Sequence, residues 1–510
     1  MQCPSRHLTA ALLLALGIPF ASPAEAASYL VHDTGEYTAA SANLQPGDEI
    51  VLANGTWNNT RLLLKGNGTA AAPITLRAQS PGQVVLTGQS DLRLAGQYLH
   101  VANLVFRNGY SPSDAVVAFR ESSKAVARNS RVTGLVIDDY SNPDPADQDQ
   151  WVMLYGAFNR LDHSQLRGKT NAGPTVVVVR DAAQGLDNQH RIDHNWFGPR
   201  PALGVNGGET LRVGTSDTSL SDSNSTVEAN WFEGCDGETE IISNKSGGNT
   251  YRGNVFYRSA GSLTLRHGNG NRVLDNVFLG DGKAGTGGVR VINAQQQVRN
   301  NYFQALAGSS NRAGLAVMYG QANAALSGYS PVVDALIERN TFVDVAKVSF
   351  GVGYNAATAM VVPPSSSQFR ANLIVNRTGS NPVTVDGSLA GVAFSGNVQP
   401  PLAPTALPGG VDSMTVTLVQ APNGLWSPSP ALADVGAATN LAVIPRDEGD
   451  HLDFVRAEAA QIAVLDQVVR VSVMACVADV GTDIVHQRGV FEPLAFAFRQ
   501  PMDSARLIED

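Results

Sequence analysis

Cysteine is scarce in this sequence of 510 residues, which contains three. Cys3 lies in an N-terminal segment that we expect to be removed, and Cys235 and Cys476 are two distant thiols that do not make a disulfide framework. A single bridge between those two is the one pairing left open. A small disulfide-stapled fold is therefore excluded, and stability has to come from an apolar core or from a bound metal.

Charged residues are also sparse, at 16%, and the formal net charge is −9. An acidic chain is a poor non-specific binder of nucleic acid, so we expect no nucleic-acid partner. A polyanionic substrate would need a local positive cleft. Few charges together with 50 glycines are typical of a β-rich protein with many tight turns.

Long apolar runs are missing beyond the first 20 residues, so no later segment is predicted to span a membrane. Residues 1–26 have the pattern of a secretory signal. A short polar start at Arg6 and His7 precedes an apolar run from Leu8 to Phe20, and Ala24-Glu25-Ala26 has the form of a cleavage site. We therefore expect an exported protein, secreted or periplasmic, that acts without a membrane and as a monomer.

A repeat of Asn-x-aromatic or Asn-x-aliphatic triplets runs through the middle of the chain. From Asn195 the steps are 35, 24, 22, 25, 39, 32 and 25 residues, as expected for solenoid coils with variable loops. Short β-branched runs separated by Gly and Asn lie between the triplets, which predicts an all-β parallel solenoid. We expect the repeated asparagines to stack at one corner and bind turn backbone. The triplets begin at Asn103 (a loose match), Asn195, Asn230, Asn254, Asn276, Asn301, Asn340 and Asn372, with a weaker one at Asn397.

The domain boundaries follow from this repeat. Residues 27–446 are predicted to form the solenoid, with the first coils in 28–100 and a loosening of the coils at the Pro-rich segment 400–408. Residues 447–510 form a C-terminal tail without triplets, to which we assign no role. Within the tail, 457–478 is rich in Ala and Val and is compatible with a helix.

Polar residues recur at similar offsets from the triplets in three consecutive coils. Asn206, Glu240 and Arg266 follow their triplet asparagines by 11, 10 and 12 residues, so we expect them in approximate register on one side of the solenoid. Glu238 shares a face with Glu240 by strand alternation, and Lys245 precedes Arg266 by 21 residues, about one coil. Carboxylate and amide oxygens suit a hard cation such as Ca²⁺. Taken alone, however, the acidic run is more typical of a solvated edge.

Two segments in these coils, 238–246 (ETEIISNKS) and 263–269 (LTLRHGN), resemble polysaccharide lyase family 6, which contains alginate lyases and chondroitinase B. The resemblance extends over residues 28–440 and implies a right-handed parallel β-helix. The chain departs from the family pattern after Arg446-Asp-Glu, where the remaining residues show no resemblance. Supporting segments are 195–200, 206–210, 212–216 and 287–292.

The resemblance implies roles for individual residues. Lys245 is similar to the catalytic base of the family and Arg266 to its catalytic acid, and the calcium ligands match Asn206, Glu238 and Glu240. Substrate contacts are expected from four further residues, of which His267 would also suit orienting Arg266 and Arg290 would also suit an ion pair between coils. These four are His267, Arg212, Glu209 and Arg290.

The implied reaction is β-elimination in a uronate polymer, most similar to the cleavage of mannuronate-rich alginate, with Ca²⁺ as cofactor. Dermatan sulfate is the alternative substrate within the family. A pectin-type hydrolase would need paired acid and base carboxylates, for which Asp138-Asp139 is the one tempting pair, although alternation sends adjacent residues to opposite faces. A non-catalytic glycan-binding β-helix is the third reading.

Overall fold

The computed structural model describes residues 26–401, 407 and 409–444, and the statements below concern these residues. The expected signal segment (except Ala26), the C-terminal tail with its expected helix, and Cys476 lie outside them, as does the boundary at 446. Cys235 is a free, buried thiol. Among the described residues no helix is long and apolar enough to cross a membrane.

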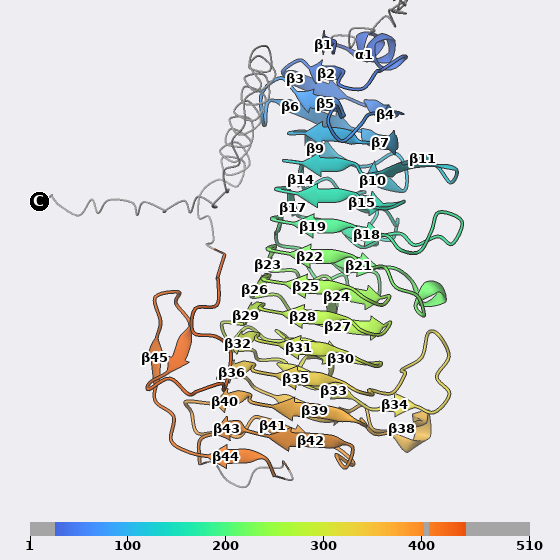
Figure 1. Ribbon diagram of the computed structural model, residues 1–510. Helices are drawn as coiled ribbons and strands as arrows, with labels where there is room; N and C mark the ends of the chain where they lie inside the picture. Colours follow the sequence, from blue (N-terminus) through green and yellow to red (C-terminus); the bar gives the residue numbers. More distant parts are fainter. Residues whose placement is uncertain (1–25, 402–406, 408, 445–510) are drawn as a thin grey trace, which may run out of the picture. The chain divides into compact units, whose positions relative to one another are not determined.

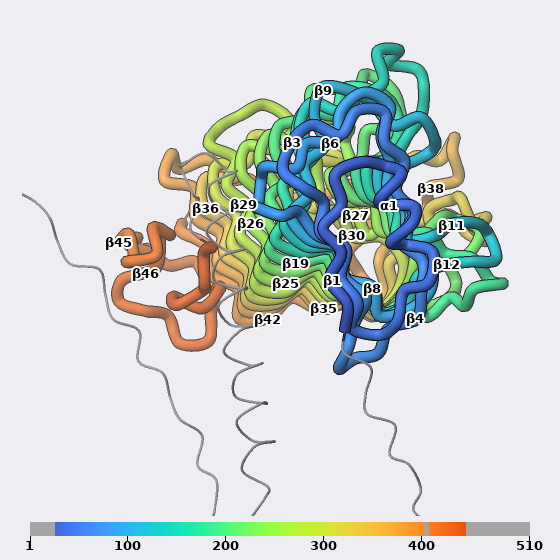
Figure 2. Tube along the Cα trace, turned by 90° about the horizontal axis from the view of Figure 1, so that it is seen from above, coloured from blue at the N-terminus to red at the C-terminus, as the bar shows by residue number. Residues whose placement is uncertain are grey.

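The chain winds into a right-handed parallel β-helix, as the repeat and the resemblance predicted (Figure 1). Three sheets of 14 strands each, parallel except for one antiparallel pair in the third, run the length of the solenoid, and each regular coil gives one strand to each sheet. Figure 2 shows the coils stacked end on. Strands far apart in the sequence are therefore neighbours whenever they occupy the same place in successive coils.

We call the three sheets A, B and C. Sheet A contains β1 (Ser28–Val31), β2 (Glu49–Leu52), β5 (Ile74–Ala78), β8 (Leu99–Ala102), β13 (Arg131–Thr133), β16 (Arg160–Asp162), β19 (Arg191–Asp193), β22 (Thr226–Glu228), β25 (Thr250–Arg252), β28 (Arg272–Leu274), β31 (Gln297–Arg299), β35 (Leu336–Glu338), β39 (Ser367–Arg370) and β42 (Val392–Ser395). Sheet B contains β3 (Gly55–Asn58), β6 (Val84–Gly88), β9 (Val105–Gly109), β14 (Val136–Asp138), β17 (Gln165–Arg167), β20 (Trp196–Phe197), β23 (Trp231–Glu233), β26 (Val255–Tyr257), β29 (Val277–Leu279), β32 (Tyr302–Gln304), β36 (Thr341–Val343), β40 (Leu373–Val375), β43 (Asn397–Gln399) and β44 (Val411–Ser413). Sheet C contains β4 (Arg61–Asn67), β7 (Asp91–Gln97), β10 (Ala115–Ala118), β11 (Arg120–Ser122), β12 (Ala125–Arg128), β15 (Gln150–Leu154), β18 (Val176–Val178), β21 (Leu211–Val213), β24 (Glu240–Lys245), β27 (Ser262–His267), β30 (Val289–Val291), β33 (Leu315–Met318), β37 (Val348–Val352) and β41 (Val383–Val385).

The remaining elements are short. The helix α1 (Thr34–Ser41) packs on the first coil, buries Tyr37 and is capped by Asp33, whose side chain accepts a hydrogen bond from the Glu36 N–H at 2.8 Å. Two antiparallel pairs and three 3₁₀ turns complete the described part: β34 (Gly320–Gln321) with β38 (Met360–Val362), β45 (Leu418–Gln420) with β46 (Trp426–Pro428), and η1 (Ser216–Thr218), η2 (Ser310–Arg312) and η3 (Ala356–Thr358).

The triplet asparagines form a buried ladder at the corner between sheets A and B, which confirms the expected stacking. From Asn230 to Asn397, each side-chain Oδ1 accepts the backbone N–H of the preceding asparagine in the ladder at 2.9–3.0 Å. The residue before each asparagine is left-handed, with φ between 52° and 60°. The amides therefore satisfy backbone groups of a tight turn that has no strand partner.

The loose triplet at Asn103 does not belong to this ladder. Asn103 is itself the left-handed residue, with φ of 65°, and Leu104 occupies the ladder position. The prediction was therefore wrong by one residue at this coil, because Asn suits both places: it tolerates the left-handed conformation and it binds turn backbone.

Inside the coils the core is a stack of matching side chains. The third triplet residue points inward in each coil, and six phenylalanines on sheet B stack with ring centroids 4.5–4.8 Å apart. This distance equals the strand spacing, so aromatic stacking and strand pairing reinforce one another. The stacked rings are those of Phe197, Phe232, Phe256, Phe278, Phe303 and Phe342.

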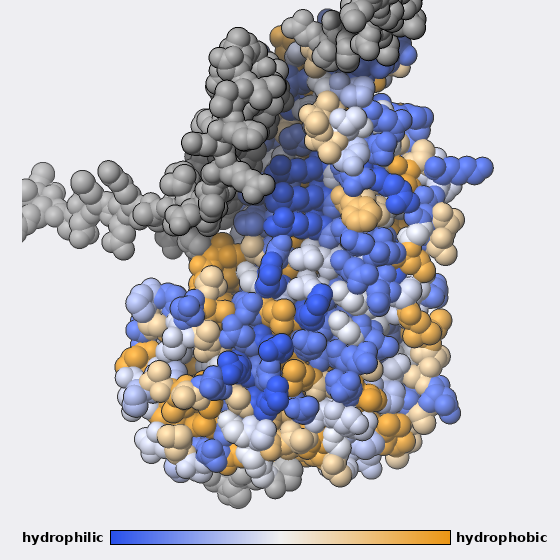
Figure 3. All heavy atoms as spheres, viewed as in Figure 1, coloured by the Kyte–Doolittle hydropathy of each residue, from blue (hydrophilic) through white to orange (hydrophobic). Residues whose placement is uncertain are grey.

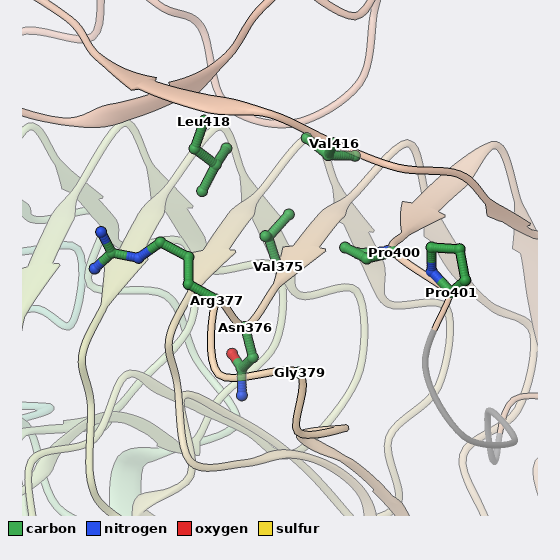
Figure 4. Close-up of a pocket in the computed structure, with 8 residues that line it drawn as sticks. All are labelled: Val375, Asn376, Arg377, Gly379, Pro400, Pro401, Val416 and Leu418. Atoms are coloured by element: carbon green, nitrogen blue, oxygen red, sulfur yellow. The ribbon is translucent and has the colours of Figure 1, made fainter.

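The segment after the last coil returns along the outside of sheet B. Leu425 and Leu441 pack on the outward-facing Trp231, Val277 and Tyr302. A cavity of about 400 Å³ lies between this segment and the last coils, lined by residues such as Val375, Arg377 and Leu418 (Figure 4). It is on sheet B and contains none of the predicted site residues.

Candidate active site

Lys245 and Arg266 lie beside one another on sheet C. Lys245 ends β24, and its partner in the neighbouring strand β27 is His267, the residue after Arg266. Both cations are partly exposed. The prediction that this lysine and arginine are neighbours in successive coils is therefore confirmed.

Two irregularities in the pairing of β24 and β27 shape this region. Glu240 pairs with Ser262 and Ile242 with Leu263, so Ile241 is an extra residue on β24. Further along, Leu265 and Arg266 on β27 together face a single residue of β24. Bulges of this kind turn side chains away from the regular alternation and are frequent near functional sites.

The bulges correct one sequence-based expectation. Glu240 lies at the start of its strand, opposite Ser262, and Arg266 lies near the end of the next strand. Asn206 precedes β21 and lies outside the strands altogether. The three residues therefore share one side of the solenoid but not one register position, because counting from the triplets ignores extra residues in strands and turns.

The guanidinium of Arg266 is held by a loop from a later coil. Its Nη1 and Nη2 donate to the carbonyls of Gly328 and Ser327 at 2.7 and 2.8 Å, and the group lies 4.0 Å from the ring centroid of Tyr329. Burial lowers the pKa of Arg266, while Tyr329 and Glu240 oppose that shift. The side chain is thus a fixed cation at the edge of the site.

His267 is a buried, neutral imidazole next to both cations. Burial, then the charges of Arg266 and Lys245, lower its pKa to about 3. Its Nε2 is 3.1 Å from the hydroxyl of Ser216, and its Nδ1 is 3.5 Å from Nη1 of Arg266. This geometry supports a role in orienting Arg266 and does not by itself show a substrate contact.

Three carboxylates gather on the adjacent coils. Glu238 accepts hydrogen bonds from the N–H groups of Gly207 and Gly208 at 2.9 and 3.3 Å. Burial, then repulsion from Glu209 and Glu240, raise the pKa of Glu238 to about 7. Glu209 is 2% exposed, and its Oε2 has no hydrogen-bond partner among the described residues. The pocket therefore holds more negative charge than its protein neighbours neutralise.

The buried Arg200 lies beside this acidic pocket and donates from its Nη1 to the backbone carbonyl of Glu209 at 2.8 Å, and Arg290 forms an ion pair within the pocket. The Nη2 of Arg290 donates to Oε1 of Glu240, and the second oxygen of Glu240 accepts from the Ser243 hydroxyl at 2.5 Å. Arg290 is 3% exposed. Of its two expected roles, the structure shows the ion pair between coils, since Glu240 and Arg290 come from strands two coils apart.

Asn206 and Arg212 are the remaining predicted residues. Asn206 is exposed in the bend just before the glycines that bind Glu238, so an amide oxygen is available beside the pocket. Arg212 occupies the outward column of sheet C in register with Ser243, and Nε of Arg212 has no hydrogen-bond partner in the described structure. Both positions suit contacts to a ligand lying along sheet C.

The donor chemistry of this pocket fits a calcium ion. Glu209 offers a buried oxygen without a partner among the described residues, and Asn206 offers an exposed amide oxygen. Glu238 offers a carboxylate whose pKa is raised by burial and by repulsion from Glu209 and Glu240. All three are oxygen ligands of the kind that Ca²⁺ prefers. Among the described residues no three Asp, Glu, His or Cys side chains already converge as a metal shell. The fit is therefore one of charge and ligand type.

Sequence reasoning missed the residues that reach the site from loops. Ser216 lies in η1, and Ser327, Gly328 and Tyr329 belong to a loop some 60 residues after Arg266. None of them has a fixed offset from a triplet. Ser243 could have been found, because it follows Glu240 by three residues in the same strand.

The hydrolase pair is not formed. Asp138 lies on sheet B in ion pairs with Arg107 and Arg167, whereas Asp139 is a left-handed turn residue. Neither carboxylate lies on sheet C with Lys245, and Asp138 is already neutralised by arginine. This arrangement does not provide the free acid and base of a glycoside hydrolase.

Comparisons with known proteins agree with the geometry. The model of the chondroitinase B family matches residues 31–441. The solved PL6 family alginate lyase AlyGC is 46% identical, with a TM-score of 0.80, and the match covers 83% of this chain and 60% of AlyGC. The chain thus spans less than two thirds of the length of that relative. No curated protein sequence matches the chain.

Two further solved structures extend the comparison. A mannuronic acid specific family 6 lyase from human gut microbiota is 30% identical, with a TM-score of 0.70 and coverage of 76% of this chain and 91% of the lyase. A PL6 alginate lyase in complex with a trisaccharide is 22% identical, with a TM-score of 0.68 and coverage of 83% and 94% respectively. The latter supports the fold alone.

Proposed function

Since the chain belongs to polysaccharide lyase family 6, the chondroitinase B family, we propose that it is an alginate lyase that cleaves the polymer by β-elimination. The observation that carries this proposal is the placement of Lys245 beside Arg266 on sheet C, next to the pocket of Glu209, Glu238 and Glu240. A base, a fixed cation and an acidic pocket in adjacent coils are the parts this chemistry requires.

In the proposed reaction, Lys245 in its neutral form accepts the proton from C5 of a uronate residue. The C5–H electrons form the C4–C5 double bond, and the C4–O bond breaks. The guanidinium of Arg266, fixed by the loop carbonyls and Tyr329, faces the leaving oxygen and stabilises its negative charge, while water supplies the proton. Neutral His267 keeps Arg266 in place without adding a third positive charge.

Calcium is the proposed cofactor, held by Asn206, Glu238 and Glu240 with Glu209 close to them. When bound, the ion neutralises the substrate carboxylate next to C5 and so makes the C5 hydrogen more acidic. The support for this proposal is the excess negative charge of the pocket and the buried oxygen of Glu209 that has no partner.

For the substrate, we propose mannuronate-rich alginate. The support is the 46% identity to AlyGC and the 30% identity to a mannuronic acid specific lyase. Dermatan sulfate is the second candidate, because the matching family model is that of chondroitinase B. A non-catalytic glycan-binding role is the remaining alternative.

The test is incubation of the purified chain with defined mannuronate and guluronate oligomers and with dermatan sulfate. An alginate lyase produces unsaturated uronate ends that absorb ultraviolet light from the alginate oligomers and leaves dermatan sulfate intact. A hydrolase would produce reducing ends without this absorbance, and a binding protein would produce neither. Ultraviolet product from dermatan sulfate alone would replace the proposal with the second candidate.

We also propose that the protein is exported and works as a monomer. The support for export is the polar, apolar and small-residue order of residues 1–26. Intact mass and N-terminal sequencing of protein recovered from cell fractions test it, and an uncleaved N-terminus in the cytoplasm would contradict it. Light scattering of the purified protein tests the monomer.

A further inference from the structure

We propose that Arg252, Arg272 and Arg299, which we call the arginine triad, form a second binding surface for an acidic polysaccharide on the outer face of sheet A. The triad is separate from the candidate active site, which lies on sheet C. The inference rests on the proposed function in one respect, namely that this function supplies the class of ligand, a polymer carrying one carboxylate per sugar.

Sheet A has a charge composition unlike that of the whole chain. Its strands contain eight arginines, no lysine and five carboxylates, which gives a formal charge of +3 in a protein of −9. Hydrophilic side chains cover much of the face in front of these strands (Figure 3). The arginines are Arg77, Arg131, Arg160, Arg191, Arg252, Arg272, Arg299 and Arg370, and the carboxylates are Glu49, Asp162, Asp193, Glu228 and Glu338.

The two signs of charge lie at different depths. The side chain of Asp193 is 0% exposed, whereas its partners Arg160 and Arg191 are 29% and 47% exposed. Glu338 is 7% exposed between Arg299 and Arg370, at 46% and 44%. The carboxylates therefore lie beneath the guanidinium groups, and a molecule approaching sheet A meets mainly positive charge.

The ladder of ion pairs is interrupted at the triad. β25, β28 and β31 are three successive strands without any carboxylate, as are β5, β8 and β13 near the first coils. The carboxylate of Asp275 near Arg252 belongs to the turn after β28. Arg252 and Arg299 occupy the same column two coils apart, about 10 Å at the usual strand spacing, and Arg272 occupies the column beside them.

The protein does not engage all the N–H donors of the triad guanidinium groups. Arg272 donates to the Thr250 hydroxyl at 3.1 Å and makes no ion pair with another described residue. Arg252 pairs with Glu228 and Arg299 with Glu338, and in each case the carboxylate is shared with a further arginine outside the triad. Since a guanidinium has five N–H donors, each group retains donors for a carboxylate from outside.

A flexible polyanion is the ligand that this surface suits. A single exposed ion pair contributes little binding free energy, so one sugar carboxylate on one arginine would bind weakly. Three arginines spread over three coils can engage successive carboxylates of one chain, and such contacts reinforce one another. The arrangement is open and flat, as expected for holding a polymer rather than enclosing a small molecule.

The experiment is affinity electrophoresis of the full-length chain carrying Lys245→Ala, so that the polymer is not degraded. We compare this parent with the same chain carrying R252Q, R272Q and R299Q, in gels containing alginate or neutral dextran. We expect alginate to retard the parent and to bind the triad variant at least about five-fold more weakly, with no effect of dextran and loss of the difference at high salt.

The matched control carries R61Q, R258Q and R339Q, three exposed, singly ion-paired arginines outside the strands of sheet A, which change the charge equally. This control is expected to bind alginate like the parent. Because the triad variant loses two ion pairs, a variant with R272Q alone is included, since this substitution removes no ion pair. It is expected to weaken alginate binding and to leave the unfolding temperature unchanged. Equal retardation of parent and triad variant overturns the proposal, as does equal weakening by the control.

A second arm separates this inference from the proposed function. With Lys245 intact, the triad variant is expected to cleave short oligomers at the wild-type kcat and to lose efficiency on long polymer. If the wild-type chain made no unsaturated ends from alginate, the proposed function would fail while the electrophoresis still tested binding. Loss of kcat on short oligomers in the triad variant would instead show that the triad acts through the site on sheet C.

Discussion

Lys245 lies opposite His267 in the next coil, and the bulge in β27 brings Arg266 to the side of the same lysine. The pairing of these two strands thus fixes both Lys245, the proposed base, and Arg266, the proposed stabilising cation. His267, whose pKa burial lowers to about 3, stays neutral between the two cations. Their spacing depends on the backbone pairing of β24 and β27, which the core below holds in place.

The lysine and the arginine are each expected to be essential. Lys245→Ala and Arg266→Ala should lower kcat by on the order of 100-fold or more, because each removes a group that acts on the reacting atoms. Both side chains are partly exposed, so folding should be unaffected. The measurement is the initial rate of ultraviolet absorbance on alginate oligomers, with circular dichroism as the folding control. Wild-type rates in either folded variant would remove that residue from the mechanism.

The acidic pocket is expected to bind calcium. Glu238→Gln and Glu240→Gln should each weaken Ca²⁺ binding by more than about 10-fold, since each removes a charged oxygen ligand. Titration calorimetry and the Ca²⁺-dependent rise in unfolding temperature measure this without using activity. Glu121→Gln, at an exposed ion pair with Lys65 on sheet C, is the matched control. If exhaustively chelated protein kept full activity, calcium would have no part in the reaction.

The asparagine ladder is expected to be a main source of stability. Asn276→Ala should cost about 1–3 kcal/mol for each buried group left without a partner, because it removes the acceptor of the Asn254 N–H and the donor to the Tyr251 carbonyl. Chemical denaturation measures the loss, and Asn43→Ala on the exposed surface is the control, with an expected change under about 0.5 kcal/mol. Equal stability of both variants would show that the ladder is dispensable.

His190 is expected to make stability depend on pH. It is fully buried, its Nδ1 accepts the Asn159 N–H at 3.1 Å, and burial lowers its pKa to about 3. Between about pH 6.5 and 3 the unfolded chain binds a proton that the folded chain does not, so this residue makes stability fall as pH falls, by up to about 1.4 kcal/mol per pH unit.

His190→Asn is the variant that tests this dependence. The substitution keeps an acceptor for the Asn159 N–H, since at the corresponding position two coils later, in the turn before sheet A, the Oδ1 of Asn249 accepts the N–H of Ser225. Stability of the variant should therefore fall less steeply than that of the wild type over that pH range, while the two proteins behave alike above pH 7. Parallel curves throughout would show that the pKa of His190 is the same in the folded and the unfolded chain, which contradicts the prediction.

Much of the fold could be predicted because successive coils repeat the same turn, whose buried backbone groups need hydrogen-bond partners. From Asn195 to Asn397, each turn at the ladder corner uses a buried amide, so Asn recurs there and its spacing gives the coil length. The failure at Asn103 has the same origin, because Asn fits two adjacent places in that turn.

The site was only partly predictable. Lys245 and Arg266 were placed together because 21 residues is about one coil. The bulges at Ile241 and at Leu265–Arg266 leave no sign in the spacing, so the register of Glu240 with Arg266 was wrong. The contact of Arg266 with Tyr329 depends on a loop whose path no periodicity describes.

The end of the asparagine ladder has a consequence for how such chains change length. Each corner is completed only by the amide of the following coil, and Asn397 has none below it, so its N–H donates instead to the carbonyl of Gly410 at 3.2 Å. That carbonyl takes the place of the next asparagine and so caps the ladder. Whole coils can be duplicated or deleted above this cap during evolution. Removing the cap would instead leave the last corner with an unpaired backbone N–H, which is an open end that another molecule could pair with.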